Sequence, residues 1–195
     1  MYHAALITGG AKRLGRDLVL ALAQRKINVV VHYNRSVDEA AETVRLASSY
    51  GVKVASIQAD LLDLKATQTL VELASKALGQ PLDVLVNNAS IFEYDGLDTA
   101  TPESWERHIN SNLRAPFFLT QAFGAQVPEA ECDENCEMKA TSAVINIVDQ
   151  RVRKLTPDFM TYTIAKMGLW AFTQTAARGM APATRVNGIA PGSTI

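Results

Sequence analysis

The chain has 195 residues and a net charge of −1 at pH 7, and 48% of its residues are hydrophobic and 20% charged. This composition suits a globular protein with one domain over residues 1–195, and the near-zero charge offers no general attraction for nucleic acid or anionic membranes. No apolar run approaches the roughly 20 residues that span a bilayer, and no signal peptide precedes the first strand. We therefore expect a cytoplasmic protein whose partners are small molecules bound at a local site.

Strand-like and helix-like segments alternate along the chain. Apolar runs predict strands at residues 4–8, 27–33, 52–58, 82–88, 143–148 and 183–190. Amphipathic segments predict the intervening helices at residues 13–25, 37–49, 64–78, 101–127 and 158–180. Strands separated by helices of this length form right-handed βαβ units and a parallel sheet that is buried on both faces. The predicted fold class is therefore α/β, a doubly wound Rossmann fold with ligands beyond the carboxyl ends of its strands.

The long helix predicted at residues 101–127 carries signals of its own. Thr101 is a suitable capping residue, and Pro102 suits the first helical position. Pro116 lies inside the helix, where a proline removes a backbone donor. We therefore expect the helix to be kinked near Pro116.

Residues 128–141 form the one irregular insertion, which we expect to be a surface loop. It contains both cysteines of the chain, Cys132 and Cys136, within the acidic stretch EAECDENCEMK. A metal site usually needs more Cys or His ligands than this pair, and the three histidines are scattered. The prediction is a pair of exposed, reduced thiols and no metal.

The first strand-to-helix turn reads TGGAKRLGR. Glycines in such a turn let the backbone pass close to a bound pyrophosphate, and the helix N-terminus supplies free N–H donors and a partial positive charge. The spacing is not a clean GxGxxG, and glycine also serves simple turns. The turn indicates a dinucleotide site whose contacts are Gly9, Arg13, Leu14 and Gly15.

The second strand ends in HYNRS, where a cofactor with a free ribose hydroxyl usually finds Asp or Glu. No acid is present, and Arg35 stands beside Ser36 instead. A guanidinium suits a ribose 2′-phosphate, although a solvated surface arginine is the alternative. This end of the strand, with Tyr33 and Asn34 also in contact, therefore predicts NADPH rather than NADH.

Two further strand ends carry polar residues. Asp60 and Leu61 follow the third strand, and Asn88, Ala89 and Ser90 of the NNAS motif follow the fourth. Both lie on the expected ligand edge of the sheet, where they are placed to touch the adenine and the ribose. Asn and Asp also populate ordinary turns, so each signal is weak alone.

Tyr162 and Lys166 are four residues apart and therefore share one face of a helix. A free tyrosine has a pKa of about 10, and a cationic neighbour lowers that value by favouring the phenolate. We expect Lys166, together with the positive nicotinamide of an oxidised cofactor, to lower the pKa of Tyr162. Such a pair also arises by chance on helix surfaces, but its position after the fifth strand favours a catalytic role.

These residues together resemble the short-chain dehydrogenase/reductase family over essentially the whole chain. The resemblance is carried by TGGAKRLG, Asp60, NNAS, Asn112 within NSNLRAP, Tyr162-xxx-Lys166, and the pair Pro191 and Gly192. It implies that Tyr162 is the proton donor, that Lys166 holds the nicotinamide ribose, and that Asn112 supports a water-linked proton path. Pro191 and Gly192 would contact the cofactor. The resemblance also implies a homodimer or homotetramer.

The chain departs from the common pattern of the family at two positions. Most members have glycine where Arg13 stands and serine where Asp149 stands. Both departures occur together in the pteridine reductases of this family, which also show HY-x-RS and NNAS followed closely by phenylalanine. This chain has HYNRS and NNASIF, with Phe92 in that place. It therefore resembles the pteridine reductases, of dihydropteridine, dihydromonapterin or dihydrofolate type.

A pterin offers ring nitrogens and a C=N bond, and the substituted residues suit it. Asp149 could hydrogen-bond Tyr162 and help relay a proton to a ring nitrogen, unless it only forms a turn. Phe92 could stack on the flat ring, unless it only packs under a loop. Arg13 could contact cofactor phosphate and substrate together. We therefore place Arg13, Phe92, Asp149 and Tyr162 in the substrate site.

The predicted function is NADPH-dependent reduction of a pterin. The alternatives are a carbonyl or 3-oxoacyl reductase and a non-catalytic NADP(H)-binding scaffold, which the missing serine would favour. The chain stops just after the sixth strand, whereas similar proteins continue with a substrate-covering loop and a seventh strand. We expect that it is a fragment of a longer protein.

Overall fold

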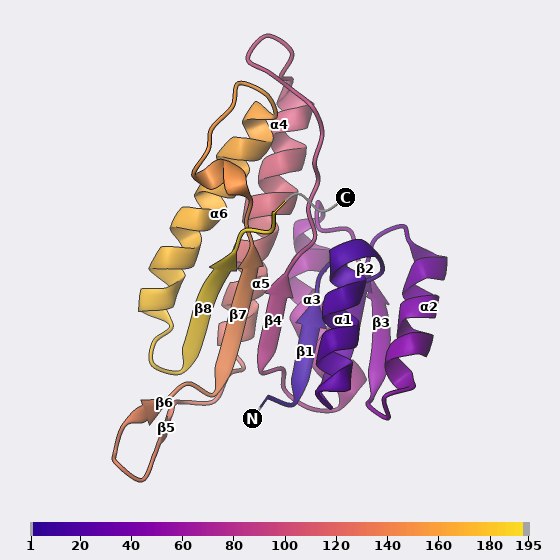
Figure 1. Ribbon diagram of the computed structural model, residues 1–195, viewed down its shortest axis with the longest axis vertical. Helices are drawn as coiled ribbons and strands as arrows, with labels where there is room; N and C mark the ends of the chain where they lie inside the picture. Colours follow the sequence, from indigo (N-terminus) through magenta and orange to yellow (C-terminus); the bar gives the residue numbers. More distant parts are fainter. Residues whose placement is uncertain (1, 193–195) are drawn as a thin grey trace.

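The computed structural model describes residues 2–192, which form a parallel sheet of six strands between two layers of helices (Figure 1). The strands lie in the order β3-β2-β1-β4-β7-β8. Their bounds are β1 (Ala4–Ile7), β2 (Asn28–Tyr33), β3 (Val54–Gln58), β4 (Val84–Asn87), β7 (Ser142–Ile147) and β8 (Thr184–Ile189). Every neighbouring pair is parallel, as the alternation of strands and helices predicts.

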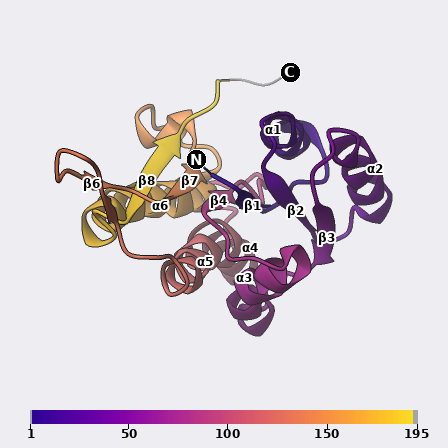
Figure 2. The ribbon, with the colours of Figure 1, turned by 90° about the horizontal axis from the view of Figure 1, so that it is seen from below.

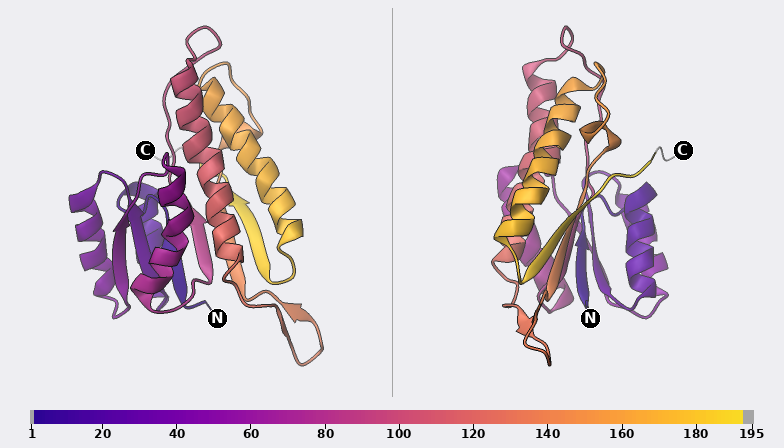
Figure 3. Two further views of the ribbon diagram at one scale, coloured as in Figure 1. Left: turned by 180° about the vertical axis from the view of Figure 1, so that it is seen from behind. Right: turned by 60° about the vertical axis from the view of Figure 1, so that its left-hand side comes forward.

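The helices cover the two faces of the sheet unequally. They are α1 (Arg13–Gln24), α2 (Val37–Ser48), α3 (Leu64–Leu78), α4 (Pro102–Ile109), α5 (Ala115–Gly124) and α6 (Met160–Gly179). Figures 2 and 3 show α1 and α2 on one face and α3, α4, α5 and α6 on the other. None of the helices described is long and apolar enough to cross a membrane.

Two hydrophobic cores hold these layers together, one on each face of the sheet. Successive strand residues point to opposite faces. Leu6 of β1 therefore packs in the core beneath α3 and α5, whereas Ile7 packs in the core beneath α1 and α2. Both side chains are fully buried, and burying a side chain of this size contributes about 1.5–3 kcal/mol. The strands are consequently rigid supports for the loops that follow them.

The helix predicted at 101–127 is continuous from α4 to α5 but contains a wider turn in its middle. A π-helical turn, η1 (Asn110–Arg114), separates α4 from α5, and Pro116 lies in the first turn of α5. Because proline has no N–H to donate, it cannot extend the α-helical hydrogen-bond ladder across this point. The chain therefore passes Pro116 after a wider turn, and the kink expected there stays a prediction. Thr101 and Ser104 form a capping box at the start of α4, with Pro102 in its first turn.

The prediction that residues 128–141 form only an irregular loop is wrong. This segment contains a short antiparallel hairpin of β5 (Glu131–Cys132) and β6 (Met138–Lys139). Asp133 stabilises its turn, because one carboxylate oxygen accepts hydrogen bonds from the backbone N–H groups of Asn135 and Glu137. Cys132 and Cys136 are free and exposed.

Candidate active site

A cleft of about 1140 Å³ opens at the carboxyl ends of the strands, where β1 and β4 lie side by side and their connections leave in opposite directions. Ligands of doubly wound sheets bind at such a point. Thirteen predicted cofactor contacts line it: Gly9, Arg13, Leu14, Gly15, Tyr33, Asn34, Arg35, Ser36, Asp60, Leu61, Asn88, Ala89 and Ser90. Pro191 and Gly192 follow β8 at the same edge but are not among the residues that line the cleft.

The glycine-rich turn leaves room for a ligand because side chains are excluded from it. Gly9 has a φ of +63°, and a Cβ placed on Gly15 would lie 2.0 Å from the carbonyl oxygen of Gly9. Lys12, at the N-terminus of α1, makes no side-chain cap. The first backbone N–H groups of α1 therefore face the cleft without a capping side chain. This arrangement fits a pyrophosphate group.

Arg13 occupies a strained backbone position in this turn. Its φ is +51°, in the left-handed region that glycine adopts most easily. The conformation explains why a glycine would be the ordinary choice here. An arginine costs roughly 1–2 kcal/mol in this conformation and places an exposed cation at the cleft.

A buried histidine tethers the turn to the sheet. His32 of β2 accepts a hydrogen bond at Nδ1 from the backbone N–H of Gly9 (3.1 Å), and its Nε2 lies 3.1 Å from the carbonyl oxygen of Ala59. Nδ1 must be unprotonated to accept, so the proton is on Nε2 and is donated to Ala59. Burial lowers the pKa of His32 to about 4, which keeps the ring neutral. Sequence reasoning missed this tether, and the only signal was a polar residue within an apolar strand.

The NNAS motif also supports the turn. The Asn88 side chain donates to the carbonyl oxygens of Thr8 (2.9 Å) and Gly9 (3.1 Å). The Thr8 hydroxyl in turn accepts from the backbone N–H groups of Asn88 and Ala89, each at 3.0 Å. The amide of Asn88 therefore joins the ends of β1 and β4, and the contacts of this motif with adenine and ribose stay a prediction.

A second group of side chains lies where β7 ends and α6 begins. The Tyr162 hydroxyl donates a hydrogen bond to Oδ2 of Asp149, at 2.9 Å. Asp149 directly follows Val148, and its other oxygen caps the short 3₁₀ turn Gln150–Val152 by accepting from the N–H of Arg151. Asp149 thus forms the turn and contacts the tyrosine at once, so the two interpretations of this residue are compatible. Ser142, at the opposite end of β7, is bonded to Thr184.

The expected lowering of the Tyr162 pKa by Lys166 is wrong for the chain by itself. Burial, the charge of Asp149 and its hydrogen bond all raise the pKa of Tyr162 above its usual value. The Lys166 ammonium donates to the carbonyl oxygen of Ile147 (2.8 Å) and lies 5.6 Å from the centre of the tyrosine ring. Burial lowers the pKa of Lys166 to about 8, although Asp149 opposes the change. The phenol is therefore held in its protonated form.

Asn112 is fully buried in the π-helical turn, and both ends of its amide are occupied. Its oxygen accepts from the N–H of Ile91 (2.9 Å), and its nitrogen donates to the carbonyl oxygen of Ile91 (2.8 Å). Asn112 therefore pairs with Ile91 as a neighbouring strand would, and fixes the segment between Ser90 and Phe92. A proton path through Asn112 stays a prediction.

Phe92 lies beside the tyrosine and is half exposed, at 52%. Its ring stacks on Phe159 with centroids 4.2 Å apart and an angle of 9°, and meets Tyr162 edge-on at 4.8 Å. The Arg151 guanidinium lies 4.8 Å from the centre of the Phe159 ring and 5.6 Å from that of Phe92. Half of the Phe92 surface is therefore open beside the Tyr162–Asp149 pair, and its stacking on a substrate stays a prediction.

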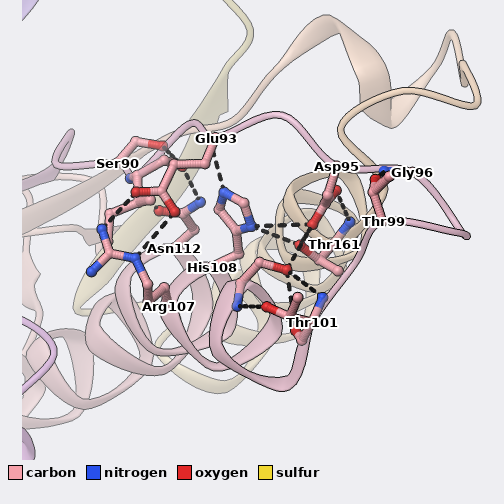
Figure 4. A network of polar contacts seen from close by, with 12 residues as sticks. Ser90, Glu93, Asp95, Gly96, Thr99, Thr101, Arg107, His108, Asn112 and Thr161 are labelled. Carbon is pink, nitrogen blue, oxygen red and sulfur yellow. Dashed lines mark hydrogen bonds and ion pairs between the residues drawn. The ribbon is translucent and has the colours of Figure 1, made fainter.

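A buried polar network beneath this site was not predicted. It joins Asp95, His108 and Thr161, which the sequence holds far apart (Figure 4). Thr161 directly precedes Tyr162. A sequence offers no sign that these three residues are buried together, because each is a common surface residue.

The sheet order and the cleft define the class, an α/β protein built to bind a dinucleotide at the switch point. A family model described as short chain dehydrogenase matches residues 3–195. The chain therefore belongs to the short-chain dehydrogenase/reductase family and is an oxidoreductase of that family. Its sequence is 30% identical over 193 residues to the 3-oxoacyl-[acyl-carrier-protein] reductase FabG of Staphylococcus epidermidis, a match that covers 98% of this chain and 75% of the relative.

Solved structures of similar proteins agree with this fold. FolM alternative dihydrofolate reductase 1 from Brucella suis, in complex with NADP, superposes with a TM-score of 0.89 at 37% identity, covering 99% of this chain and 76% of that one. A short chain dehydrogenase from Burkholderia cenocepacia, also in complex with NADP, has a TM-score of 0.89 at 29% identity, with coverages of 99% and 75%. The relatives differ in their named substrates, so family membership alone leaves the substrate open.

Proposed function

We propose that this protein is an NADPH-dependent reductase of pterins, of dihydropteridine, dihydromonapterin or dihydrofolate type. The observation that carries the proposal is the hydrogen bond from the Tyr162 hydroxyl to the Asp149 carboxylate, with the half-exposed Phe92 ring beside it. A carboxylate at this position suits a substrate whose ring nitrogen takes up a proton. The similarity to FolM supports the same choice.

The cleft supports NADPH as the cofactor. The uncapped start of α1 and the glycine turn fit a pyrophosphate, and the exposed Arg35 and the half-buried Ser36 line the place beyond β2 where a 2′-phosphate would lie. HYNRS contains no carboxylate that would favour a free ribose hydroxyl. When bound, NADPH supplies the hydride.

The chain's own residues handle the proton. Tyr162 donates its phenolic proton to a ring nitrogen of the substrate, so that the O–H bond breaks as the N–H bond forms. In the chain by itself, burial and Asp149 raise the pKa of Tyr162, so the phenol is protonated but is a weaker acid than a free tyrosine. A phenolate beside Asp149 is unfavourable, and the half-buried carboxylate offers a route for a proton to return from solvent.

Phe92 and Arg13 orient the substrate in this proposal. The exposed half of the Phe92 ring offers a flat surface for an offset stack with a pterin. Arg13, exposed at the start of α1, contacts cofactor phosphate and substrate from the other side of the cleft. Lys166, buried at the carbonyl of Ile147, is placed to hold the nicotinamide ribose.

A carbonyl or 3-oxoacyl thioester reductase is the second candidate, because the FabG relatives are 30% identical to this chain. The test is NADPH oxidation with dihydrobiopterin, dihydromonapterin and dihydrofolate, set beside a simple ketone and a 3-oxoacyl thioester. Tyr162→Phe should lower pterin turnover at least about 100-fold, since general acid catalysis contributes that much or more. Asp149→Ser should harm pterin reduction more than any ketone activity. Turnover of ketones alone would assign the protein to the second candidate.

We also propose that the protein forms a homodimer or homotetramer through α5 and α6. These helices lie side by side, and their outer surface exposes Phe117 (43%), Ile164 (43%) and Met167 (38%). Phe117 contacts Phe172 of α6 at 5.1 Å, so the two helices present one apolar surface. Sedimentation of the parent and of Phe117→Glu tests this, and a monomeric parent would contradict it.

A further inference from the structure

Helix α6, which carries Tyr162 and Lys166, begins without a cap of its own. Phe159 stands at the capping position with a φ of +57° and offers no side-chain hydrogen bond. The cap comes instead from Asp95, 66 residues earlier in the chain. Its Oδ1 accepts from the N–H of Thr161 (3.1 Å), and its carbonyl oxygen accepts from the N–H of Met160 (3.3 Å).

The hydrogen bonds around this cap are donated in one order, from His108 to Thr161 and from Thr161 to Asp95. His108 accepts a hydrogen bond at Nε2 from the N–H of Glu93 (3.1 Å), so its proton is on Nδ1. That N–H donates to the Thr161 hydroxyl (2.6 Å), which therefore donates its own proton to Oδ2 of Asp95 (2.5 Å). Figure 4 shows the three side chains pointing toward one another. The sequence of donors fixes the rotamer of Thr161.

The cap carries a negative charge in a closed environment. Asp95 is 1% exposed and His108 is fully buried. Burial raises the pKa of the Asp95 carboxyl, but the hydrogen bonds from Thr161 and Ser104 together outweigh it, and the pKa lies below its usual value. Asp95 is therefore ionised at the positive end of α6, where a negative charge is favourable.

The network contacts both the proposed proton donor, Tyr162, and the loop that carries Phe92. Thr161 is covalently next to Tyr162, and the His108 ring meets the Tyr162 ring edge-on at 5.9 Å. The loop that carries Phe92 is held at one side by Asn112, through Ile91, and at the other by Asp95. One buried carboxylate thus ties the Phe92 loop to the first turn of α6.

We propose that Asp95, Thr161 and His108 are positioning residues that fix Tyr162 relative to the substrate surface of Phe92. The inference rests on the proposed function only in taking Tyr162 as the proton donor. None of the three touches the reacting atoms, so their effect is on the rate of the chemical step. A misplacement of about 1 Å in such a group can cost about 100-fold in rate.

The test compares Thr161→Val, which removes the hydroxyl at nearly constant shape, with Thr161→Ser, which restores it. Thr173→Val is the matched control, because Thr173 is also buried on α6 and its hydroxyl, like that of Thr161, both donates, to the Leu169 carbonyl, and accepts, from the Asn146 side chain. We expect Thr161→Val to lower kcat about 10- to 100-fold with little change in NADPH affinity or substrate KM. Thr161→Ser and Thr173→Val should stay within about twofold of the parent.

Three results would overturn the proposal. The first is a kcat of Thr161→Val within about twofold of the parent. The second is an equal loss in Thr161→Ser, since the hydroxyl would then not be the operative group. The third is a joint loss of turnover and NADPH binding, which would indicate a general structural role.

A second measurement does not depend on activity. Asp95→Asn should accelerate amide hydrogen exchange in residues 160–163 about tenfold, because a charged acceptor is lost from the helix start. Thr173→Val should leave these amides unchanged, and unchanged exchange in Asp95→Asn would contradict the proposal. If the parent reduces ketones and not pterins, the function proposed above fails while both measurements still decide this inference.

Discussion

The N-termini of α1 and α6 have similar backbone conformations but different surroundings. Each begins beside a non-glycine residue with positive φ, Arg13 at +51° and Phe159 at +57°, and neither has a side-chain cap from its own capping residue. The start of α1 opens onto the large cleft, whereas the start of α6 is closed by the Asp95 carboxylate. The first is therefore free to bind an anion, and the second already contains one.

In the proposed function, α1 binds a phosphate of the cofactor and α6 carries the proton donor, and this explains the difference. A helix that binds a phosphate needs its N–H groups for the ligand, so a capping carboxylate would compete with the cofactor. In the proposed function α6 presents a proton donor, which needs a fixed first turn, and the Asp95 carboxylate caps that turn. Different side chains support the two helix starts. His32 and Asn88 hold the loop before α1, whereas His108 holds Thr161 at the cap of α6.

The largest expected effect comes from filling the open end of α1. In Gly15→Ala the new Cβ would lie 2.0 Å from the Gly9 carbonyl oxygen, so the turn must move. We expect NADPH affinity to fall about 100-fold or more, because an overpacked backbone contact costs up to about 3 kcal/mol. Isothermal titration measures this. Gly179→Ala, where an added Cβ meets nothing within 4 Å, is the control, and equal affinities for the two variants would refute the steric account.

The tether of the same turn gives a pH dependence. Burial lowers the pKa of His32 to about 4 from an ordinary value of about 6.5, so the unfolded chain binds the proton more tightly between these values. The contribution of His32 to the free energy of unfolding should therefore fall by about 3 kcal/mol as pH drops from about 6.5 to about 4, and this contribution should stop changing at lower pH. Urea unfolding across this range measures the slope.

His32→Asn should lose the part of the slope that His32 contributes, since asparagine can accept from Gly9 without titrating, whereas His108, whose pKa burial also lowers, keeps its own part. His3→Asn, at an exposed histidine, serves as the control and should keep it. A parent whose stability is constant between about pH 6.5 and 4 would show that His32 is not buried as a neutral tether.

The phosphate end of the cleft offers the next effect. Arg35→Ala should weaken NADPH binding about 10- to 100-fold, the equivalent of about 1.5–3 kcal/mol for a hydrogen bond to a charged group. NADH, which lacks the 2′-phosphate, should bind both proteins alike. Arg25→Ala changes an exposed arginine at the far end of α1 and is the control. An equal loss for NADH would place Arg35 elsewhere in the site.

The sequence predicts the open end of the site better than the closed one. Gly9, Arg35 and Asp60 each follow a strand, so the alternation of strands and helices is enough to bring them to one cleft. Asp95, His108 and Thr161 come together only through packing, and their contacts span 53 and 66 residues. The hairpin β5–β6 shows no alternation of apolar residues that would predict it from the sequence. Hydrogen bonds to Asp133, rather than burial, stabilise its turn.

The pKa of Tyr162 shows the same limit. Helical spacing identifies Lys166 as a neighbour, but it says nothing of the burial of the phenol or of the hydrogen bond that the phenol donates to Asp149. In the folded chain, burial and that carboxylate decide the direction. Residue spacing can therefore identify the proton donor more readily than it can give its acidity.

Phe159→Gly and Arg13→Gly compare the backbone strain at the starts of α6 and α1 through the free energy of unfolding. Glycine relieves the positive φ in both cases. Phe159 also stacks on Phe92 and lies under Arg151, contacts that are each worth about 1 kcal/mol. We therefore expect Phe159→Gly to lower the free energy of unfolding by about 1 kcal/mol in urea titrations. An increase would mean that the stack contributes little.

Arg13→Gly should have the smallest effect and the opposite sign. Glycine occupies the left-handed region without the roughly 1–2 kcal/mol that arginine costs there. Its greater freedom in the unfolded chain reduces this gain by about 0.5–1 kcal/mol. The net gain in the free energy of unfolding is about 0.5 kcal/mol, since no hydrogen bond or ion pair from the exposed Arg13 side chain is present among residues 2–192 to be lost. Stability should rise while kcat/KM for pterins falls, because the variant loses the cation that the proposed function places against the substrate. A variant that is more stable and equally active would remove Arg13 from the substrate site.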